Sequence, residues 1–377
     1  MSGARRAAMG RPDAPPTRPT AGCSDSGCPA SAPGGMRTNA GCRCDAVELH
    51  HADVLDALRA MPDNSFHGCL TDPPYGLSFM GHQWDHGVPS AEVWREVLRV
   101  LRPGAHLLAF GGTRTFHRLT CAIEDAGFEV RDCMMWLYGS GFPKSHNGPW
   151  GGTALKPAWE PIIVSRKPLA GTVAANVQAH GCGGLAIDAS RVEAGGPDVN
   201  ARKNKGTGER FGGRTFGVMH GDGSGWEATQ GRWPANVILD EEAGAALDAQ
   251  SGGASRFFYC AKASRAERDA GLEGFAAQAT SRYGEQGQGP TPQQTPRKPV
   301  EQRNVHPTVK PLALAAYLAR LILPPVEGTR LLVPFCGSGS EMLGGLRAGW
   351  SHVEGIDSWD VAVRIARARL AHAAGAP

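Results

Sequence analysis

The segment Thr71-Asp72-Pro73-Pro74-Tyr75-Gly76 combines residue types that suit one particular reaction. An exocyclic amine of adenine or cytosine is a poor nucleophile because its lone pair is delocalised into the ring. The Asp72 carboxylate and the Pro73 carbonyl can accept its two hydrogens, and the consecutive prolines restrict the backbone that carries this carbonyl. The Tyr75 ring offers a stacking face for a base turned out of a duplex. The alternative is a simple turn in which Asp72 caps and the prolines end a strand.

A second segment, Leu331 to Ser340, reads as a strand that runs into a Gly-Ser-Gly turn and then a helix. Gly337 and Gly339 let the backbone approach a ligand closely. Asp357 ends the next predicted strand, where an acid is placed to bind ribose hydroxyls. A plain strand-to-helix connection is the alternative. The turn lacks the Gly-Lys-Ser/Thr sequence of a phosphate loop, which disfavours nucleoside triphosphate hydrolysis.

Alternating helix and strand patterns must position both segments. The expected helices span 91–101, 113–126 and 311–322, and the expected strands span 67–70, 106–110, 128–138, 159–166, 331–335 and 351–357. Pro103-Gly104 is expected to stop the first of these helices. Such alternation with short connections predicts an α/β fold in which helices cover a mostly parallel sheet. Ligands of these sheets bind at the carboxyl ends of the strands, where both segments lie.

Changes in composition and hydrophobic pattern divide the chain into four parts. Residues 1–45 are predicted to be a disordered leader, because they are largely Pro-, Gly-, Ser- and Arg-rich without a hydrophobic period. Residues 46–167 form the catalytic half and 301–377 the cofactor-binding half of one α/β domain. Between them, residues 168–300 are Gly-rich and polar, with short apolar islands at 234–239 and 257–261, and are expected to form an irregular inserted region.

Overall composition and charge indicate the class of protein but do not identify a ligand. The net charge of +3 does not by itself indicate a nucleic-acid binder, so DNA-binding charge must gather on one face. No run approaches the roughly 18 apolar residues of a membrane span, and no signal peptide is visible, which predicts a cytoplasmic protein with reduced thiols. Zinc binding by Cys23, Cys28, Cys42 and Cys44 is disfavoured by their irregular spacing, and no metal is expected.

The two motifs in this order resemble the amino-methylating DNA methyltransferases that act on adenine N6 or cytosine N4. The resemblance is to the permuted group, in which the DPPY motif precedes the glycine motif, and it covers residues 46–167 and 256–370. It implies the Rossmann-like, doubly wound sheet of class I S-adenosylmethionine-dependent methyltransferases, with residues 168–300 as the target-recognition region. The implied cofactor is S-adenosylmethionine and the implied substrate is double-stranded DNA in the nucleoid. A homodimer and a cognate restriction endonuclease are further implied partners.

The resemblance also implies roles for individual residues. Asp72, Pro73, Pro74 and Tyr75 form the catalytic motif. Asp53 matches the acid that contacts the cofactor adenine, and Asp357 the acid that contacts its ribose. The remaining implied cofactor-binding residues are His306, Thr308, Lys310 and Pro311 of the HPTxKP segment, and Phe335, Cys336, Gly337, Ser338, Gly339 and Glu341 of the glycine motif.

One position departs from the family pattern. Val333 stands where the family has Asp before Pro-Phe, an acid that helps to hold the ammonium group of the cofactor. Either Asp72 or Glu341 must then substitute, or the cofactor binds more weakly.

Candidate DNA contacts are distributed over several loops. The stretch after Trp136, LYGSGFPKS, resembles the base-contacting loop. Basic residues suited to phosphate contact are Lys144, Arg202, Lys203, Lys205, Arg210, Lys262 and Arg265, with a solvated loop as the alternative for 202–214. His82, Trp84, Asp85 and His86 either line the DNA or cofactor channel or lie in a surface loop. Trp226 and Trp233 are expected to anchor the core of a small subdomain, with base stacking as the alternative.

Other reactions fit the sequence less well. Methylation at cytosine C5 requires a nucleophilic cysteine, usually after proline, and no Pro-Cys pair occurs. Asp rather than Ser at position 72 favours adenine N6 over cytosine N4. RNA or protein methylation is the next alternative, although such enzymes generally carry Asn at the position of Asp72. A non-catalytic DNA-binding regulator is made conceivable by Val333.

Overall fold

The computed structural model describes residues 46–77, 85–139, 141, 147–193, 231–261, 265–280 and 300–375. All of them fall within one compact unit, Gly41–Pro377. The strands are β1 Val47–His51, β2 Phe66–Thr71, β3 Leu101–Phe110, β4 Glu129–Leu137, β5 Trp159–Arg166, β6 Val237–Asp240, β7 Tyr259–Ala261, β8 Gln278–Thr280, β9 Val300–Gln302, β10 Arg330–Pro334 and β11 His352–Asp357. The α-helices are α1 Val54–Ala60, α2 Ala91–Val100, α3 Phe116–Asp125, α4 Val173–His180, α5 Glu241–Ser251, α6 Arg265–Asp269, α7 Leu312–Leu321, α8 Ser340–Ala348 and α9 Asp360–Ala373.

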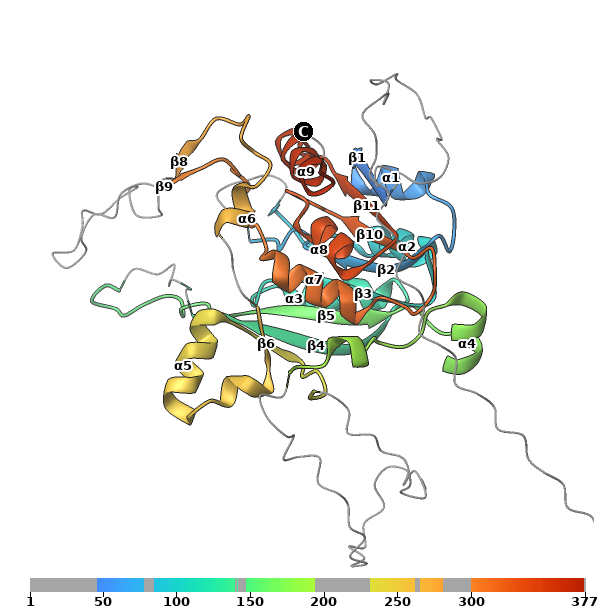
Figure 1. Cartoon of the computed structure of the whole chain (residues 1–377), viewed down its shortest axis with the longest axis horizontal. Coiled ribbons are helices and arrows are strands. Elements are labelled where there is room, and N and C mark those ends of the chain that lie inside the picture. The colour runs from blue at the N-terminus through green and yellow to red at the C-terminus, as the bar shows by residue number, and fades with distance from the viewer. Residues whose placement is uncertain are drawn as a thin grey trace, which may run out of the picture. The chain divides into compact units, whose positions relative to one another are not determined.

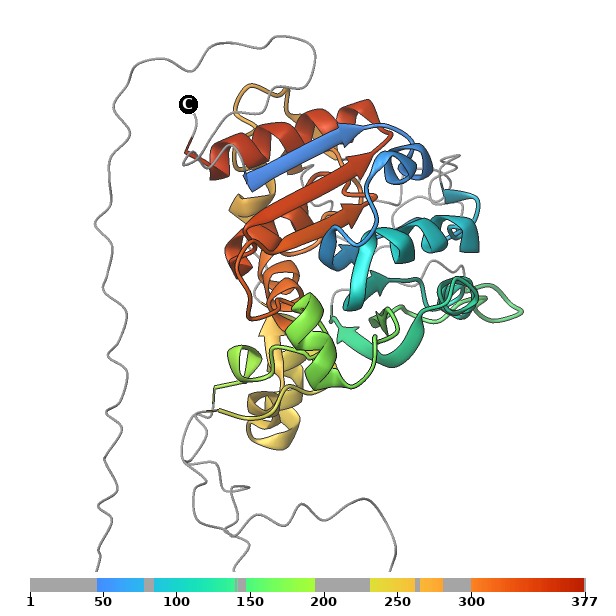
Figure 2. The same cartoon turned by 90° about the vertical axis from the view of Figure 1, so that its right-hand side faces the viewer.

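Nine strands form one sheet in the order β1-β11-β10-β2-β3-β5-β4-β6-β7. Strand β5 is antiparallel to both of its neighbours, β3 and β4, and every other pairing in this sheet is parallel. Figure 2 shows β1 from the beginning of the described chain beside the strands of its carboxyl-terminal part. The sheet therefore places strands from the two ends of the described sequence side by side, with β2 paired to β10.

Helices cover both faces of this sheet (Figure 1). Buried side chains of α1, α2 and α3, among them Leu58, Trp94 and Ile123, pack on one face. Side chains of α7 and α8, together with Leu370 of α9, pack on the other face. Strand β2 is buried along its whole length, as expected for a parallel strand covered on both sides. The prediction of an α/β, doubly wound and mostly parallel sheet is confirmed.

Individual boundaries follow the hydrophobic pattern closely, with two differences. Helix α2 ends at Val100 and β3 begins at the next residue, so Pro103 and Gly104 lie inside a strand instead of stopping the helix. The inserted region is also more regular than expected, since it contains α4 and α5. Asp240 caps α5 by accepting a hydrogen bond of 2.7 Å from the Ala243 amide. Strands β6 and β7 of this region extend the main sheet.

Candidate active site

The two chemical motifs meet at the carboxyl edge of the sheet. Strand β2 leads into Asp72, and its neighbour β10 leads into the glycine turn. The Thr71 hydroxyl donates a hydrogen bond of 2.6 Å to the Pro334 carbonyl, and this contact is fully buried on the Thr71 side. Residues 263 positions apart are thus fixed side by side. This arrangement is the one that ligand binding at the strand ends of an α/β sheet requires.

The glycine turn is held in an unusual backbone conformation. Phe335, Gly337 and Gly339 all have positive φ angles, of 55°, 50° and 78°. The Gly337 amide donates to Asp357 Oδ2 at 2.8 Å, and the opposite carboxylate oxygen accepts from the Trp359 amide at 2.8 Å. Asp357 therefore joins the turn to the end of β11. Burial raises its pKa, although these amide bonds oppose that rise.

Two further side chains support this turn. A side-chain carbon at Gly337 would lie 2.8 Å from His306 Nε2, so glycine permits the close approach of the HPTVKP segment. Burial, reinforced by the nearby cations of Lys310 and Arg268, lowers the pKa of His306 to about 4, which keeps its ring neutral at pH 7. On the other side, the buried Arg369 donates to the Ser338 carbonyl at 2.6 Å.

Asp72 is the centre of a buried hydrogen-bond network. Lys310 Nζ lies 2.9 Å from Asp72 Oδ2 and 3.1 Å from Glu160 Oε2. The Tyr75 hydroxyl donates to Asp72 Oδ1 at 2.8 Å and also lies 3.2 Å from Glu160 Oε2. Lys310 further donates to the Tyr75 hydroxyl oxygen at 3.1 Å. One cation and one phenol therefore orient two carboxylates that come from β5 and from the loop after β2.

The charges of this network are set by opposing effects. Burial penalises the Lys310 ammonium, but Asp72 and Glu160 more than compensate and raise its pKa. Burial, with the same two carboxylates, raises the pKa of Tyr75 well above its usual value, so the phenol stays protonated and acts as a donor. The resulting arrangement has a fixed positive charge beside Asp72. Both oxygens of Asp72 accept hydrogen bonds within this network.

A cavity of about 1030 Å³ opens between the two motifs. Its walls include the predicted residues Asp72, Pro73, Pro74, Tyr75, Asp85, His306, Thr308, Lys310, Phe335, Cys336, Gly337, Ser338, Glu341 and Asp357. This volume suits a cofactor together with part of a substrate. The close backbone approach at Gly337 and the Asp357 carboxylate fit a nucleoside-bearing ligand, as an S-adenosylmethionine site requires.

Three predicted cofactor residues do not line this cavity. Asp53 caps α1, accepting hydrogen bonds from the amides of Leu55 at 2.8 Å and Asp56 at 3.3 Å. Pro311 lies at the N-cap of α7. A side-chain carbon at Gly339 would meet Ala366 of α9 at 3.2 Å, so this glycine serves the packing of two helices. Asp53 stays a predicted cofactor contact.

Asp85 holds the loop after Tyr75 in place through hydrogen bonds. Its carboxylate accepts hydrogen bonds from the amides of Gly76 at 2.8 Å and Leu77 at 3.1 Å, and the residue is only 2% exposed. Asp85 therefore positions the loop that follows the DPPY segment, besides lining the cavity. His86, by contrast, is exposed and does not line it.

Most of the predicted DNA contacts lie outside the described residues. This holds for Lys144, Arg202, Lys203, Lys205, Arg210, Lys262, His82, Trp84 and Trp226. Arg265 begins α6, but its side chain is not among those described. Trp233 is 65% exposed, so the expectation that it anchors a core is wrong. The guanidinium of Arg191 lies 5.6 Å from the centre of the Trp233 ring, so this tryptophan contacts a charged side chain at the surface.

Sequence reasoning missed several residues of the cavity wall. Glu160 is the most important of them, because it pairs with Lys310 and Tyr75. Arg114, Trp359 and the stretch 153–159 also line the cavity, as does Tyr138, which belongs to the LYGSGFPKS stretch predicted to contact the base. The only available signal for Glu160 was an acid at the start of an otherwise apolar predicted strand.

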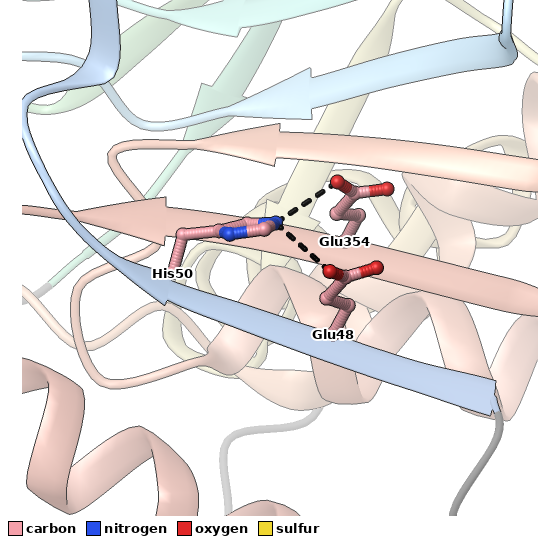
Figure 3. A group of neighbouring side chains, drawn as sticks. All are labelled: Glu48, His50 and Glu354. Carbon is pink, nitrogen blue, oxygen red and sulfur yellow. Dashed lines mark hydrogen bonds and ion pairs between the residues drawn. The ribbon is translucent and has the colours of Figure 1, made fainter. Parts of the chain in front are cut away.

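A separate polar cluster lies where β1 and β11 pair. His50 Nε2 lies 2.9 Å from Glu354 Oε1 and 3.6 Å from Glu48 Oε1 (Figure 3). These side-chain types can hold a metal ion, but Glu354 already accepts a hydrogen bond of 2.7 Å from Arg330. The bonds to His352, His50 and Arg330 overcome the effect of burial and lower the pKa of Glu354 to about 2. We interpret the group as an ion-pair cluster that joins strands.

Comparisons with known proteins found similar proteins both by sequence and by structure. The chain is 22% identical over 197 residues to the type II methyltransferase M.HindIII of Haemophilus influenzae. The matched segment covers 36% of this chain and 63% of the relative. More than a third of the relative's length is therefore not spanned. Among solved structures, M1.HpyAVI matches with a TM-score of 0.43 and 13% identity, covering 86% of this chain and 98% of that one. The cytosine-N4-specific PvuII DNA methyltransferase matches with a TM-score of 0.47 and 13% identity, covering 86% of each chain.

The described helices include none with the length and hydrophobicity of a membrane span. A family model described as DNA methylase matches residues 66–343, which include the DPPY segment, the HPTVKP segment and the glycine turn. Because this match covers well over half of the 377 residues, the chain belongs to the N6/N4 DNA methylase family.

Proposed function

We propose that the protein transfers a methyl group from S-adenosylmethionine to the N6 amine of adenine in DNA. The observation that carries this proposal is the position of Asp72, which lines a large cavity directly beside the glycine turn. Family membership supports the reaction class. The Asp at the head of the motif favours adenine over cytosine.

The chain's own residues explain how an amine would be activated. Asp72 and the Pro73 carbonyl accept the two amine hydrogens, so that the nitrogen lone pair is withdrawn from the ring and becomes available. Both Asp72 oxygens already accept a donor from Lys310 or Tyr75, but a carboxylate offers about four lone-pair sites and can accept another hydrogen. Lys310 and Tyr75 hold the carboxylate in one orientation. Most of the rate acceleration then comes from positioning.

The cofactor site uses the opposite wall of the cavity. Phe335, Gly337 and Ser338 would hold the methionine part, and Asp357 the ribose. S-adenosylmethionine supplies an electrophilic methyl group when it is bound there. The base enters from the side of Pro74 and Tyr75, whose phenol ring supports it by stacking. Residues 168–300 would supply target recognition, and the basic residues named above would contact the DNA backbone.

Mass spectrometry of nucleosides tests this proposal. Unmethylated DNA of varied sequence is incubated with the full-length protein and S-adenosylmethionine, beside Asp72→Asn. Asp56→Asn is a matched control, because Asp56 is an exposed acid of α1 outside the cavity. We expect N6-methyladenine with the wild type and with Asp56→Asn, and none with Asp72→Asn.

The alternative results separate the competing reactions. N4-methylcytosine would overturn the choice of base and retain amine methylation. Methylation of RNA or of protein, with none on DNA, would overturn the proposal. Full activity of Asp72→Asn would show that the catalytic group lies elsewhere.

A further inference from the structure

Glu341 is a buried acid that faces the cofactor side of the cavity. It lies in the first turn of α8, immediately after the glycine turn, and is 4% exposed. The residue lines the cavity together with Ser338 and Ser340. Buried carboxylates are normally paired with a cation. Glu341 is therefore placed to receive a charged group of a ligand.

The two nearest buried cations of the described chain are already committed to other partners. Lys310 forms its ion pairs with Asp72 and Glu160. Arg369 donates its hydrogen bonds to Ser338 and Ser340 on one side of the turn and to the Glu267 carbonyl. Both cations act on Glu341 electrostatically, but no ion pair within 4.0 Å joins either of them to it. The residues described thus leave its carboxylate without a direct cationic partner.

Position 333 cannot supply the missing charge. Val333 is fully buried in an apolar cluster that also contains Leu331 and Met342. Asp72 is another acid near the turn, but it is already paired with Lys310, and its remaining lone pairs are those proposed to accept the amine hydrogens of the base. Asp357 accepts hydrogen bonds from the amides of Gly337 and Trp359 and is the residue proposed to bind the ribose. Glu341 is then the acid on this wall of the cavity that has neither a direct cationic partner nor another proposed role.

We propose that Glu341 binds the α-ammonium group of the methionine part of S-adenosylmethionine, in place of the acid absent at Val333. The inference rests on the proposed function, because it assumes the same cofactor in the same cavity. The sequence alone allowed either Asp72 or Glu341 to bind this ammonium group, and the inference assigns that role to Glu341.

A proton would be released when the cofactor binds. Burial, followed by repulsion from Asp72, raises the pKa of Glu341 to about 7, so near this pH part of the population carries a proton. An ammonium group beside the carboxylate favours its ionised form and expels that proton. The affinity for ligands that carry the ammonium group should therefore fall as the pH decreases below about 7.

Calorimetric titration of the full-length protein tests this role with two probes. S-adenosylhomocysteine carries the ammonium group, whereas 5′-methylthioadenosine lacks the whole amino-acid part. We expect Glu341→Gln to weaken S-adenosylhomocysteine binding on the order of 10- to 100-fold, as for the loss of a charged hydrogen bond. Binding of methylthioadenosine should change less than about twofold. Glu327→Gln, an exposed acid outside the cavity, should leave both affinities unchanged.

The same titrations are repeated at pH 7 in buffers of different ionisation enthalpy. The dependence of the binding enthalpy on the buffer gives the number of protons released when the ligand binds. The wild type should release protons with S-adenosylhomocysteine and Glu341→Gln should not. Equal losses for both probes would show a general effect on the cavity and overturn the proposal. An unchanged affinity for S-adenosylhomocysteine would also overturn it and leave Asp72 as the ammonium acceptor.

The failure of either proposal can be recognised separately. A wild type that binds S-adenosylhomocysteine in a Glu341-dependent manner but methylates no DNA would retain this inference and refute the proposed function. If the wild type methylates DNA but Glu341→Gln binds S-adenosylhomocysteine normally, the proposed function is retained and this inference is refuted. If the wild type bound neither probe, both proposals would fall.

Discussion

Lys310 Nζ lies 2.9 Å from Asp72 Oδ2, and both side chains are largely shielded from water. The lysine comes from the HPTVKP segment and the acid from the DPPY segment, 238 positions earlier in the chain. Their contact fixes the orientation of the group that is proposed to accept the amine hydrogens. It also holds Glu160 of β5 in the same network.

Removing the lysine charge should destabilise the protein and abolish methyl transfer. In Lys310→Met, Asp72 and Glu160 lose the cation between them, and loss of one partner of a buried pair costs about 3–5 kcal/mol. Urea denaturation measures this change. The double variant Lys310→Met/Glu160→Gln, which removes one of the two carboxylates, should recover part of the stability. A single variant as stable as the wild type would contradict the network.

Two substitutions of Tyr75 separate its hydroxyl from its ring. Tyr75→Phe loses the hydrogen bonds to Asp72 and Glu160 but retains the stacking face. Tyr75→Ala also loses the stacking, which is worth about 1–3 kcal/mol per base. Single-turnover methylation should therefore be reduced about 5- to 150-fold more in Tyr75→Ala than in Tyr75→Phe. Equal rates would exclude a stacking role for the ring.

Gly337→Ala should weaken cofactor binding more than its backbone strain alone predicts. Alanine at φ 50° is strained, and its side chain would lie 2.8 Å from His306 Nε2. Gly328→Ala is a matched control, because Gly328 has φ 66° and open space around it. Each change should lower stability by about 1 kcal/mol through the backbone. Only Gly337→Ala should also reduce binding of S-adenosylhomocysteine, measured by calorimetry.

The cluster at β1 and β11 should make stability depend on acidity. Glu354 has a pKa of about 2 in the folded protein and about 4.5 when unfolded. Its depressed pKa stabilises the fold above pH 4.5, and this contribution disappears as the pH falls towards 2. Glu354→Gln should therefore cost about 2 kcal/mol in urea denaturation at pH 7 and clearly less at pH 3. A difference independent of pH would show that Glu354 acts through packing alone.

The sequence predicted the neighbouring strands β2 and β10 well because each is a short, mostly apolar run that ends at a motif. The buried strands β2 and β10 lead directly into the two motifs, and the chemistry of the motifs identified the edge at which they meet. Helix α2 was predicted within one residue at its carboxyl end, since its apolar positions recur with a helical period.

Residues whose roles depend on distant pairing could not be predicted in the same way. Glu160 reaches Lys310 because β5 inserts antiparallel between β3 and β4, and no local pattern encodes that order. Helix α5 was missed because alanines and glycine give it little hydrophobic contrast. Trp233 was expected in a core because of its size, but its exposure depends on which surfaces surround it.

The pairing of β2 with β10 also has a consequence for biosynthesis. A ribosome completes β2 more than 250 residues before it completes β10, so β2 cannot acquire this neighbour until the intervening residues have been synthesised. Until then the nascent chain exposes an apolar strand edge that is prone to pair with other chains. The candidate active site is therefore completed late in synthesis, and contacts of such long range are slow to form. Protection of this edge by a chaperone would raise the yield of folded protein.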